Sequence, residues 1–172
     1  MRLACFLMIG GAAYAQTTAV VTDEYVPARE AVTARGMAPK MRVSQLSPTA
    51  RTFRVVFGKG DEVASGLAEF AEKNHIQNAH FTAVGAFDSA TLGFGDIAKQ
   101  AHRKILVNGE AELVSFSGGI TSENGKPRVH AHAVFALPDA TTRGGHFIDG
   151  HVSITMEVYV VDNGEGGESK TP

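Results

Sequence analysis

Four of the seven histidines in this 172-residue chain fall between residues 130 and 151. His130 and His132 are separated by one residue, so on a β-strand their side chains point from the same face. His146 follows Gly144 and Gly145, and glycines allow the backbone to bend sharply. Neutral imidazole is the commonest protein metal ligand, and three imidazoles leave a fourth position on zinc open. The spacing therefore predicts that His130, His132 and His146 bind one divalent metal ion, with zinc as the expected metal.

Other interpretations of these histidines stay open on the sequence alone. His130 and His132 are also compatible with hydrogen-bonded surface side chains at a subunit contact, because the alternate residues of their strand are apolar. His151 is an alternative third ligand in place of His146. The remaining histidines are expected to be structural or exposed: His75, His80 and His102.

Two carboxylates are candidates for assisting the metal. Glu157 interrupts an apolar segment, and it either faces solvent or acts as an acid–base group or hydrogen-bonding partner at the metal site. Glu112 precedes another apolar segment and is equally ambiguous. Because a metal with an open position can lower the pKa of its bound water to near neutrality, a metal-dependent hydrolase or lyase is an alternative to a metal-binding protein.

The first 15 residues have the pattern of a secretory signal peptide. Arg2 precedes an apolar run at residues 3–9, and the Ala-Tyr-Ala sequence at residues 13–15 is typical of a cleavage site. We expect cleavage before Gln16 and export to the periplasm or the medium. Cleavage would remove Cys5, the only cysteine, so disulfides and thiol catalysis are excluded for the mature chain.

Composition and charge argue against nucleic-acid and membrane partners. The chain is 44% hydrophobic and 20% charged, which is enough apolar surface for a globular core. The net charge of −2 provides no basic surface for nucleic acid. The apolar run near the N-terminus is too short to cross a bilayer permanently.

The chain divides into a linker, one folded domain and a tail. Residues 16–50 contain three prolines and are expected to form a flexible linker or tail. The domain is expected over residues 51–162, and the Gly- and Glu-rich residues 163–172 are expected to be disordered. Within the domain, alternation predicts a strand over 52–57. Helical spacing then predicts an amphipathic helix over 61–74 with Asp61 as its N-cap.

The remainder of the domain is rich in β-forming residues. Strands are predicted at residues 79–87, 90–94, 104–107, 110–121, 128–137 and 151–161, with irregular structure over 96–104. The Asn108-Gly109 dipeptide and the Glu-Asn-Gly-Lys sequence at residues 123–126 predict hairpin turns. One helix with many hairpin-linked strands predicts an α+β fold with a mostly antiparallel sheet.

The order of motifs resembles that of a known family. A Gly-x-Gly-Asp-Glu-Val sequence at residues 58–63 opens the helix, and Ala-Val-Gly-Ala-Phe follows at residues 83–87. Glu112 begins a segment that ends in Gly-Gly-Ile at residues 118–120. The sequence His-x-His follows at residues 130–132, and Gly-Gly-His follows at residues 144–146. Gly-x-Val at residues 150–152, Thr155 and Glu157 complete the pattern. This pattern resembles the PPC domain (plant and prokaryote conserved domain) over roughly residues 52–162.

The resemblance carries expectations about fold, assembly and ligands. It implies an antiparallel sheet with a packed helix, a homotrimer, and in some members a metal on the histidines that match His130, His132 and His146. Plant members carry AT-hook motifs and bind DNA, but this chain has no Arg-Gly-Arg-Pro sequence. We therefore expect an exported, trimeric metal-binding protein with an unidentified small-molecule ligand. The hydrolase or lyase is the alternative, and acidic charge, the signal peptide and the missing AT-hook disfavour a DNA-binding protein.

Overall fold

The computed structural model describes residues 18–27, 36–45 and 51–164. These residues form one helix and seven strands: β1 (Thr18–Pro27), β2 (Arg42–Gln45), β3 (Thr52–Gly58), α1 (Val63–Lys73), β4 (Asn78–Asp96), β5 (Ala101–Glu123), β6 (Lys126–Ala136) and β7 (Thr142–Asp162). The proposed signal peptide and residues 165–172 lie outside the described residues. In the part that is described, no helix has the length and apolar character needed to cross a membrane.

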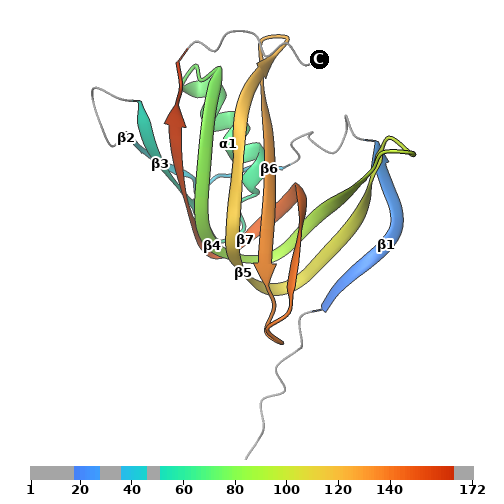
Figure 1. Cartoon of the computed structure of the whole chain (residues 1–172). Helices are drawn as coiled ribbons and strands as arrows, with labels where there is room; N and C mark the ends of the chain where they lie inside the picture. Colours follow the sequence, from blue (N-terminus) through green and yellow to red (C-terminus); the bar gives the residue numbers. More distant parts are fainter. Residues whose placement is uncertain (1–17, 28–35, 46–50, 165–172) are drawn as a thin grey trace, which may run out of the picture.

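All strand pairs are antiparallel, in the order β1-β5-β4-β7-β3-β2. Strand β6 lies off this path and pairs with both β5 and β7. Because β4 also pairs with β5 and β7, these four strands form a closed circuit of neighbours. The long strands curve strongly, and α1 lies behind the sheet (Figure 1). The predicted α+β fold with a mostly antiparallel sheet and one main helix is confirmed.

The strands are longer than the sequence indicated. The segments predicted at 79–87 and 90–94 form one strand, β4, with an irregularity between Phe87 and Ser89. The residues expected to be irregular after Asp96 include only a short turn before β5 begins at Ala101. Hydrogen bonding to neighbouring strands extends each element beyond its apolar run, because each added residue gains ladder partners.

One of the two predicted hairpins is wrong. Asn108 and Gly109 lie inside β5, and Gly109 has a φ of 93°. The pairing with β4 continues on both sides, from Asn108 opposite Ser89 to Ala111 opposite Phe87, so the extra residues form a bulge. The other hairpin is confirmed, since residues 124 and 125 have φ values of 51° and 75° between β5 and β6.

The expected linker contains two strands. β1 pairs with β5, with Val20 opposite Leu106, and β2 pairs with β3. Val26 at the end of β1 is buried. The linker prediction is therefore wrong for residues 18–27 and 42–45. The prolines of this segment indicated a linker, but pairing with the distant strands β5 and β3 outweighed that local signal.

Helix α1 begins two residues later than predicted, and its N-cap is Glu62 and not Asp61. The Glu62 carboxylate accepts hydrogen bonds from the backbone N–H groups of Ala64 and Ser65, at 3.0 and 2.7 Å. The Asp61 carboxylate accepts two backbone hydrogen bonds from outside the helix, at 2.9 and 2.8 Å. Both carboxylates are buried, and their hydrogen bonds offset the cost of desolvation.

Phenylalanines connect the strands through the core. Phe116 packs on Phe81 and Phe147 with ring centroids 5.4 and 5.0 Å apart. Phe87 in turn contacts Phe147 and Phe135 at 6.1 and 5.0 Å. Burying an aromatic side chain contributes about 1.5–3 kcal/mol, so this row strongly favours one orientation of each strand. Phe135 belongs to β6, and its inward side chain fixes which residues of β6 point outward.

Candidate metal site

Strand β6 presents His130 and His132 on its outer face. The residues between and after them, Ala131 and Ala133, are 2% and 1% exposed and face the core. Both histidines are exposed. The period-2 alternation of the sequence therefore gave the correct face for this pair.

Strand β7 supplies His146, which lies directly opposite His132 in the β6–β7 pair. The sequence analysis assigned Gly144 and Gly145 as a sharp bend before it, and this is wrong. Both glycines are regular members of β7, neither has a positive φ, and they pair with β6. A Cβ at Gly145 would lie 2.6 Å from the carbonyl oxygen of Gly93, so this glycine permits close approach of β4. Strand register, and not a hinge, brings His146 to the pair.

The three imidazoles form a compact triangle. Ring centroids lie 5.6 Å apart for His130 and His132, 5.0 Å for His130 and His146, and 5.5 Å for His132 and His146. Each residue offers one ring nitrogen, and these nitrogens all lie within 4.8 Å of one another. Nitrogens on a tetrahedral zinc are about 3.3 Å apart, given Zn–N bonds of about 2.0–2.1 Å. Small side-chain rotations would bring these nitrogens to that spacing.

Electrostatics favours the neutral, metal-binding form of the imidazoles. Although the His130 side chain is exposed, neighbouring side chains partly desolvate its ring and lower its pKa, and the nearby His132 and Arg128 lower it further. Burial likewise lowers the pKa of His102, again with a contribution from His132. Several imidazoles this close cannot all carry a proton without repulsion. His130 and His102 therefore resist protonation more than an isolated surface histidine would.

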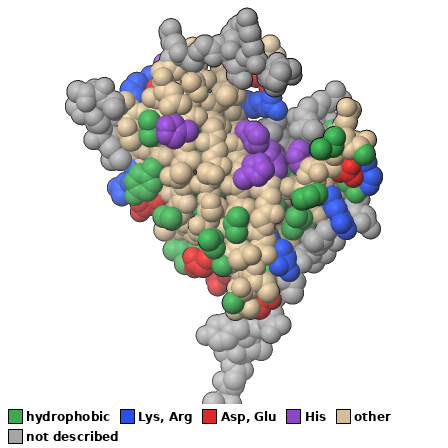
Figure 2. Space-filling view, viewed as in Figure 1, with side chains coloured by type: hydrophobic (Ala, Val, Ile, Leu, Met, Phe, Trp, Pro, Cys, Tyr) green, Lys and Arg blue, Asp and Glu red, His purple; other side chains and the backbone are tan. Residues whose placement is uncertain are grey.

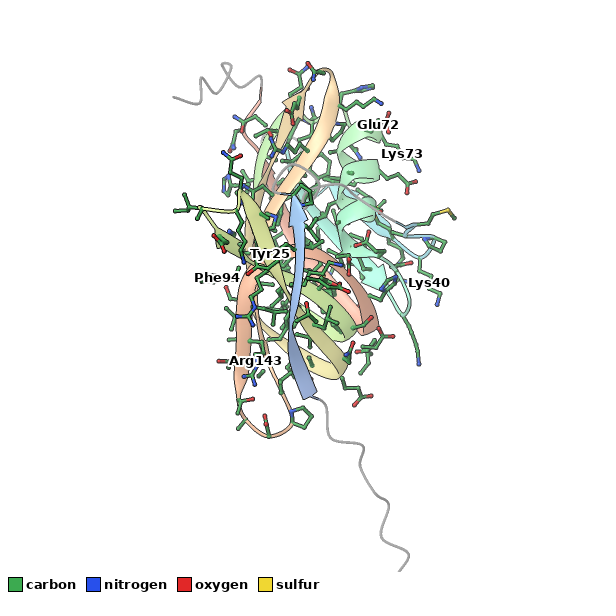
Figure 3. The ribbon with its side chains drawn as sticks, turned by 90° about the vertical axis from the view of Figure 1, so that its right-hand side faces the viewer. Tyr25, Lys40, Glu72, Lys73, Phe94 and Arg143 are labelled. Carbon is green, nitrogen blue, oxygen red and sulfur yellow. The ribbon has the colours of Figure 1, made fainter. Side chains whose placement is uncertain are left out.

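The site lies on the face of the sheet opposite α1. Figure 2 shows histidine side chains gathered near the middle of this face. In the edge-on view of Figure 3, Glu72 and Lys73 lie on the helix side of the sheet. Phe94 and Arg143 project from the opposite side. No element of the described chain covers this face in Figure 1, in agreement with the exposure of His130 and His132.

Glu157 does not reach the histidines. Its carboxylate accepts a hydrogen bond from the Tyr159 hydroxyl at 2.9 Å and lies 3.6 Å from the Arg54 guanidinium. In the sheet it is opposite Val56 of β3 and Val84 of β4, far along β7 from His146. Its predicted role as a hydrogen-bonding or acid–base group at the metal site is therefore wrong.

The other candidates are also placed elsewhere. Glu112 is exposed and lies opposite Ala136, at the end of β6 distant from His130. His151, the alternative third ligand, is exposed and lies opposite Ser89. Neither belongs to the three-histidine group. His75 is exposed, as expected.

His102 is the residue that the sequence analysis missed. Its ring stacks on that of His146, with centroids 4.7 Å apart and an interplanar angle of 24°. It also lines a surface pocket of about 770 Å³, which includes Pro27 of β1 and the turn between β4 and β5. The alternating glycines Gly93 and Gly95 are the only related feature of the sequence, and strand pairing is needed to place them opposite the segment that carries His102.

Comparisons with known proteins agree with this architecture. The family described as the Plants and Prokaryotes Conserved (PCC) domain matches residues 45–163. The structure of a plant- and prokaryote-conserved (PPC) protein from Pyrococcus horikoshii is similar with a TM-score of 0.66 and 25% identity, covering 81% of this chain and 92% of that one. No curated protein matches the chain.

Two further solved structures are similar at 28% identity. A metal-containing protein from Archaeoglobus fulgidus has a TM-score of 0.61, with 72% of this chain and 82% of that chain covered. A protein from Ralstonia eutropha JMP134 with a proposed DNA-binding role has a TM-score of 0.64, with coverage of 69% and 81%. The family match begins within β2 and ends just after β7, so it includes all the site residues.

Proposed function

The chain belongs to the Plants and Prokaryotes Conserved domain family, and on that premise we propose that it binds one divalent metal ion through His130, His132 and His146. The observation that carries the proposal is the group of three ring nitrogens within 4.8 Å of one another, on an uncovered face of the sheet. The metal content of the similar Archaeoglobus fulgidus protein supports it.

Zinc is the metal we propose. Three neutral imidazoles suit zinc, which commonly takes three protein ligands and leaves a fourth position open. When bound, such an ion polarises a ligand in that position or lowers the pKa of a bound water. The pocket beside His102 adjoins the site and has a volume typical of small-molecule pockets, so we propose that a small molecule occupies it near the metal.

Metal titration tests this proposal. The purified protein is stripped with a chelator and titrated with Zn²⁺ by calorimetry, and Co²⁺ is used in parallel to obtain an absorption spectrum. We expect one ion per chain and a Co²⁺ spectrum of a four- or five-coordinate site. Absence of stoichiometric binding at pH 7.5, or equal binding by a triple alanine variant of the three histidines, would contradict the proposal.

The alternative function, a hydrolase or lyase, has less support. Neither Glu157 nor Glu112, the two carboxylates considered as acid–base groups, contacts the three histidines. A binding protein is therefore the function that the geometry favours. Zinc-dependent turnover of an ester, phosphate or amide substrate that is lost in His132→Ala would reverse this preference.

We propose further that the protein assembles as a homotrimer, as the family resemblance implies. Exposed apolar side chains on strands of the sheet support an assembly: Val84, Val114 and Ile154 are 60%, 60% and 72% exposed. Light scattering coupled to gel filtration should give three times the chain mass at micromolar concentration. A monomer under these conditions would contradict the assembly without affecting the metal site.

We also propose export, based on the signal-peptide pattern of residues 1–15. Intact-mass analysis of the protein from its native source should show a chain that starts at Gln16. A cytoplasmic protein that retains Met1 would contradict this.

A further inference from the structure

His102 reaches the histidine cluster across a neighbouring strand. It belongs to β5 and lies opposite Gly95 of β4, while His146 of β7 lies opposite Gly93 of β4. Strand β4 thus separates the two histidines, and strands two apart are about 9–10 Å from each other. Their rings nevertheless lie 4.7 Å apart and nearly parallel.

The contact depends on a missing side chain in the intervening strand. A Cβ at Gly93 would lie 2.9 Å from the Cβ of His102 and 3.1 Å from its Cδ2. Any other residue at this position would therefore push the His102 ring away from His146. At Gly95 the nearest approach of a Cβ is 3.8 Å, an ordinary contact. Gly93 is consequently the residue that makes room for the stacking.

The contact involves the ring face and not a hydrogen bond from Nδ1. Among the described residues, no hydrogen-bond partner lies near the buried Nδ1 atom of His102. His102 is also not a member of the group whose nitrogens can meet at one ion. It covers His146, which is only 5% exposed although its two partner histidines are exposed.

We propose that His102 is a positioning residue that fixes the ring plane of His146, so that its ligating nitrogen faces His130 and His132. This role rests on the proposed three-histidine metal site. Rotation of an imidazole about its terminal torsion is soft, with two broad minima. A flat ring stacked on one face restricts that rotation. Removing the stacked ring should lower the fraction of molecules in which the His146 ring is oriented for ligation, and the metal affinity would fall in proportion.

Zinc affinity of four proteins tests the role of stacking. The wild type is compared with His102→Ala, His102→Phe and the control His80→Ala, by competition with a chromophoric chelator. Histidine 80 is exposed, lies on β4 and bonds to Asn163, so its loss should leave affinity unchanged. We expect roughly a 10-fold or greater loss for His102→Ala, as for other residues that orient metal ligands. His102→Phe keeps a flat ring and should stay within about 3-fold of the wild type.

A second measurement follows the orientation of the His146 ring in the metal-free protein. In ¹H–¹³C spectra of the metal-free protein, nuclear Overhauser effects between the ring protons of His146 and those of His130 and His132 should be alike in the wild type and His102→Phe, and weaker in His102→Ala. Gly93→Ala, which displaces His102 through its new Cβ, should resemble His102→Ala in both measurements. This variant keeps the test decisive if His102→Ala folds poorly.

Three results would overturn the proposal. The first is wild-type zinc affinity in His102→Ala. The second is an equal loss of affinity in His102→Phe and His102→Ala, which would show that the His102 nitrogens matter. The third is that the nuclear Overhauser effects between the His146 ring and the His130 and His132 rings are unchanged in His102→Ala. If the wild type itself binds no zinc, the three-histidine site is wrong. The nuclear Overhauser effects still decide separately whether His102 orients His146.

Discussion

His132 and His146 are direct partners across the antiparallel β6–β7 pair. Their ring centroids lie 5.5 Å apart, and their separation is set by the strand register and not by a loop. A one-residue slip would turn one of them to the opposite face of the sheet. The inward packing of Ala131, Ala133 and Phe135 opposes such a slip, so the hydrophobic core itself maintains the ligand geometry.

The first prediction is that single alanine variants separate metal binding from folding. His130→Ala and His132→Ala should each weaken zinc binding by about 100-fold or more, beyond the about 10–100-fold typical of residues that only orient ligands. Because both side chains are exposed, the melting temperature of the metal-free protein should change little. Zinc competition and calorimetry on the same preparations measure both quantities.

The matched control for these variants is His80→Ala, another exposed histidine of the sheet. Its zinc affinity should equal that of the wild type. A loss of the same size as in His132→Ala would mean that the histidines act only through general charge or folding.

The second prediction concerns pH. The pKa of His130 and that of His102 lie below their ordinary value of 6.5, mainly because neighbouring side chains partly desolvate both rings. The unfolded chain therefore binds more protons than the folded chain as the pH falls below about 6.5. Stability of the metal-free protein should be constant above this pH and should decline as the pH falls towards the lowered pKa values. Urea unfolding between pH 8 and pH 5 measures the trend.

Metal binding should show a related pH dependence. Protons compete with zinc for imidazole, so affinity should fall in acid. Since the pKa of His130 is lowered, zinc should be retained to lower pH than an unperturbed imidazole would allow. Chelator competition across the same pH range checks this. Increasing affinity with decreasing pH would contradict histidine ligation.

The third prediction concerns Glu62, whose buried carboxylate joins α1 to β7. It caps the helix and also accepts a hydrogen bond from the backbone N–H of Gly150 at 3.3 Å. Glu62→Ala would leave these groups unpaired in the interior, which costs about 1–3 kcal/mol. Thermal unfolding should therefore shift down by about 2–4 °C for each kcal/mol lost.

Two further variants make this measurement specific. Glu62→Gln keeps one acceptor oxygen and should lose less stability than Glu62→Ala. The control Glu72→Ala removes an exposed carboxylate from the same helix and should change stability by no more than about 0.5 kcal/mol. A loss in Glu72→Ala as large as that in Glu62→Ala would indicate that removing any carboxylate from this helix lowers stability, and not the loss of the buried hydrogen bonds.

The sequence predicted the site better than the elements around it. Period-2 alternation was sufficient to place His130 and His132 on one outward face, because it depends only on local geometry. His146 does lie beside this pair, but strand register and not a glycine bend brings it there. His102 could not be assigned in this way, because its contact depends on the order of three strands and on the missing side chain of Gly93.

The incorrect assignments share a physical cause. Glu157 was considered for the site because it interrupts an apolar segment, but its position is explained by Arg54 and Tyr159 on the same sheet. Asn108 and Gly109 have a typical hairpin sequence, but the long β4–β5 pairing on both sides favours a bulge over a turn. In both cases a tertiary partner outweighed the local signal.

The fourth prediction is that the protein does not bind DNA at physiological salt, although a structural neighbour has a proposed DNA-binding role. Four basic side chains on or beside the strands form ion pairs with acidic ones, which reduces their field. The ion pairs are Arg51–Asp162, Arg54–Glu157, Lys104–Glu24 and Arg128–Glu123, at 3.1, 3.6, 2.9 and 3.1 Å. The net charge is −2. Non-specific DNA binding depends on releasing counterions from phosphates, which requires unpaired positive charge.

Fluorescence anisotropy of a labelled AT-rich duplex measures this, with an AT-hook peptide as positive control. We expect no change in anisotropy up to 10 µM protein in 150 mM salt, where non-specific binders have Kd values of about 10⁻⁴–10⁻⁶ M. Zinc-loaded and metal-free protein should behave alike, because one ion adds little to the field of the whole chain. Binding that weakens steeply between 50 and 200 mM salt would reveal a basic surface and would restore the DNA-binding alternative.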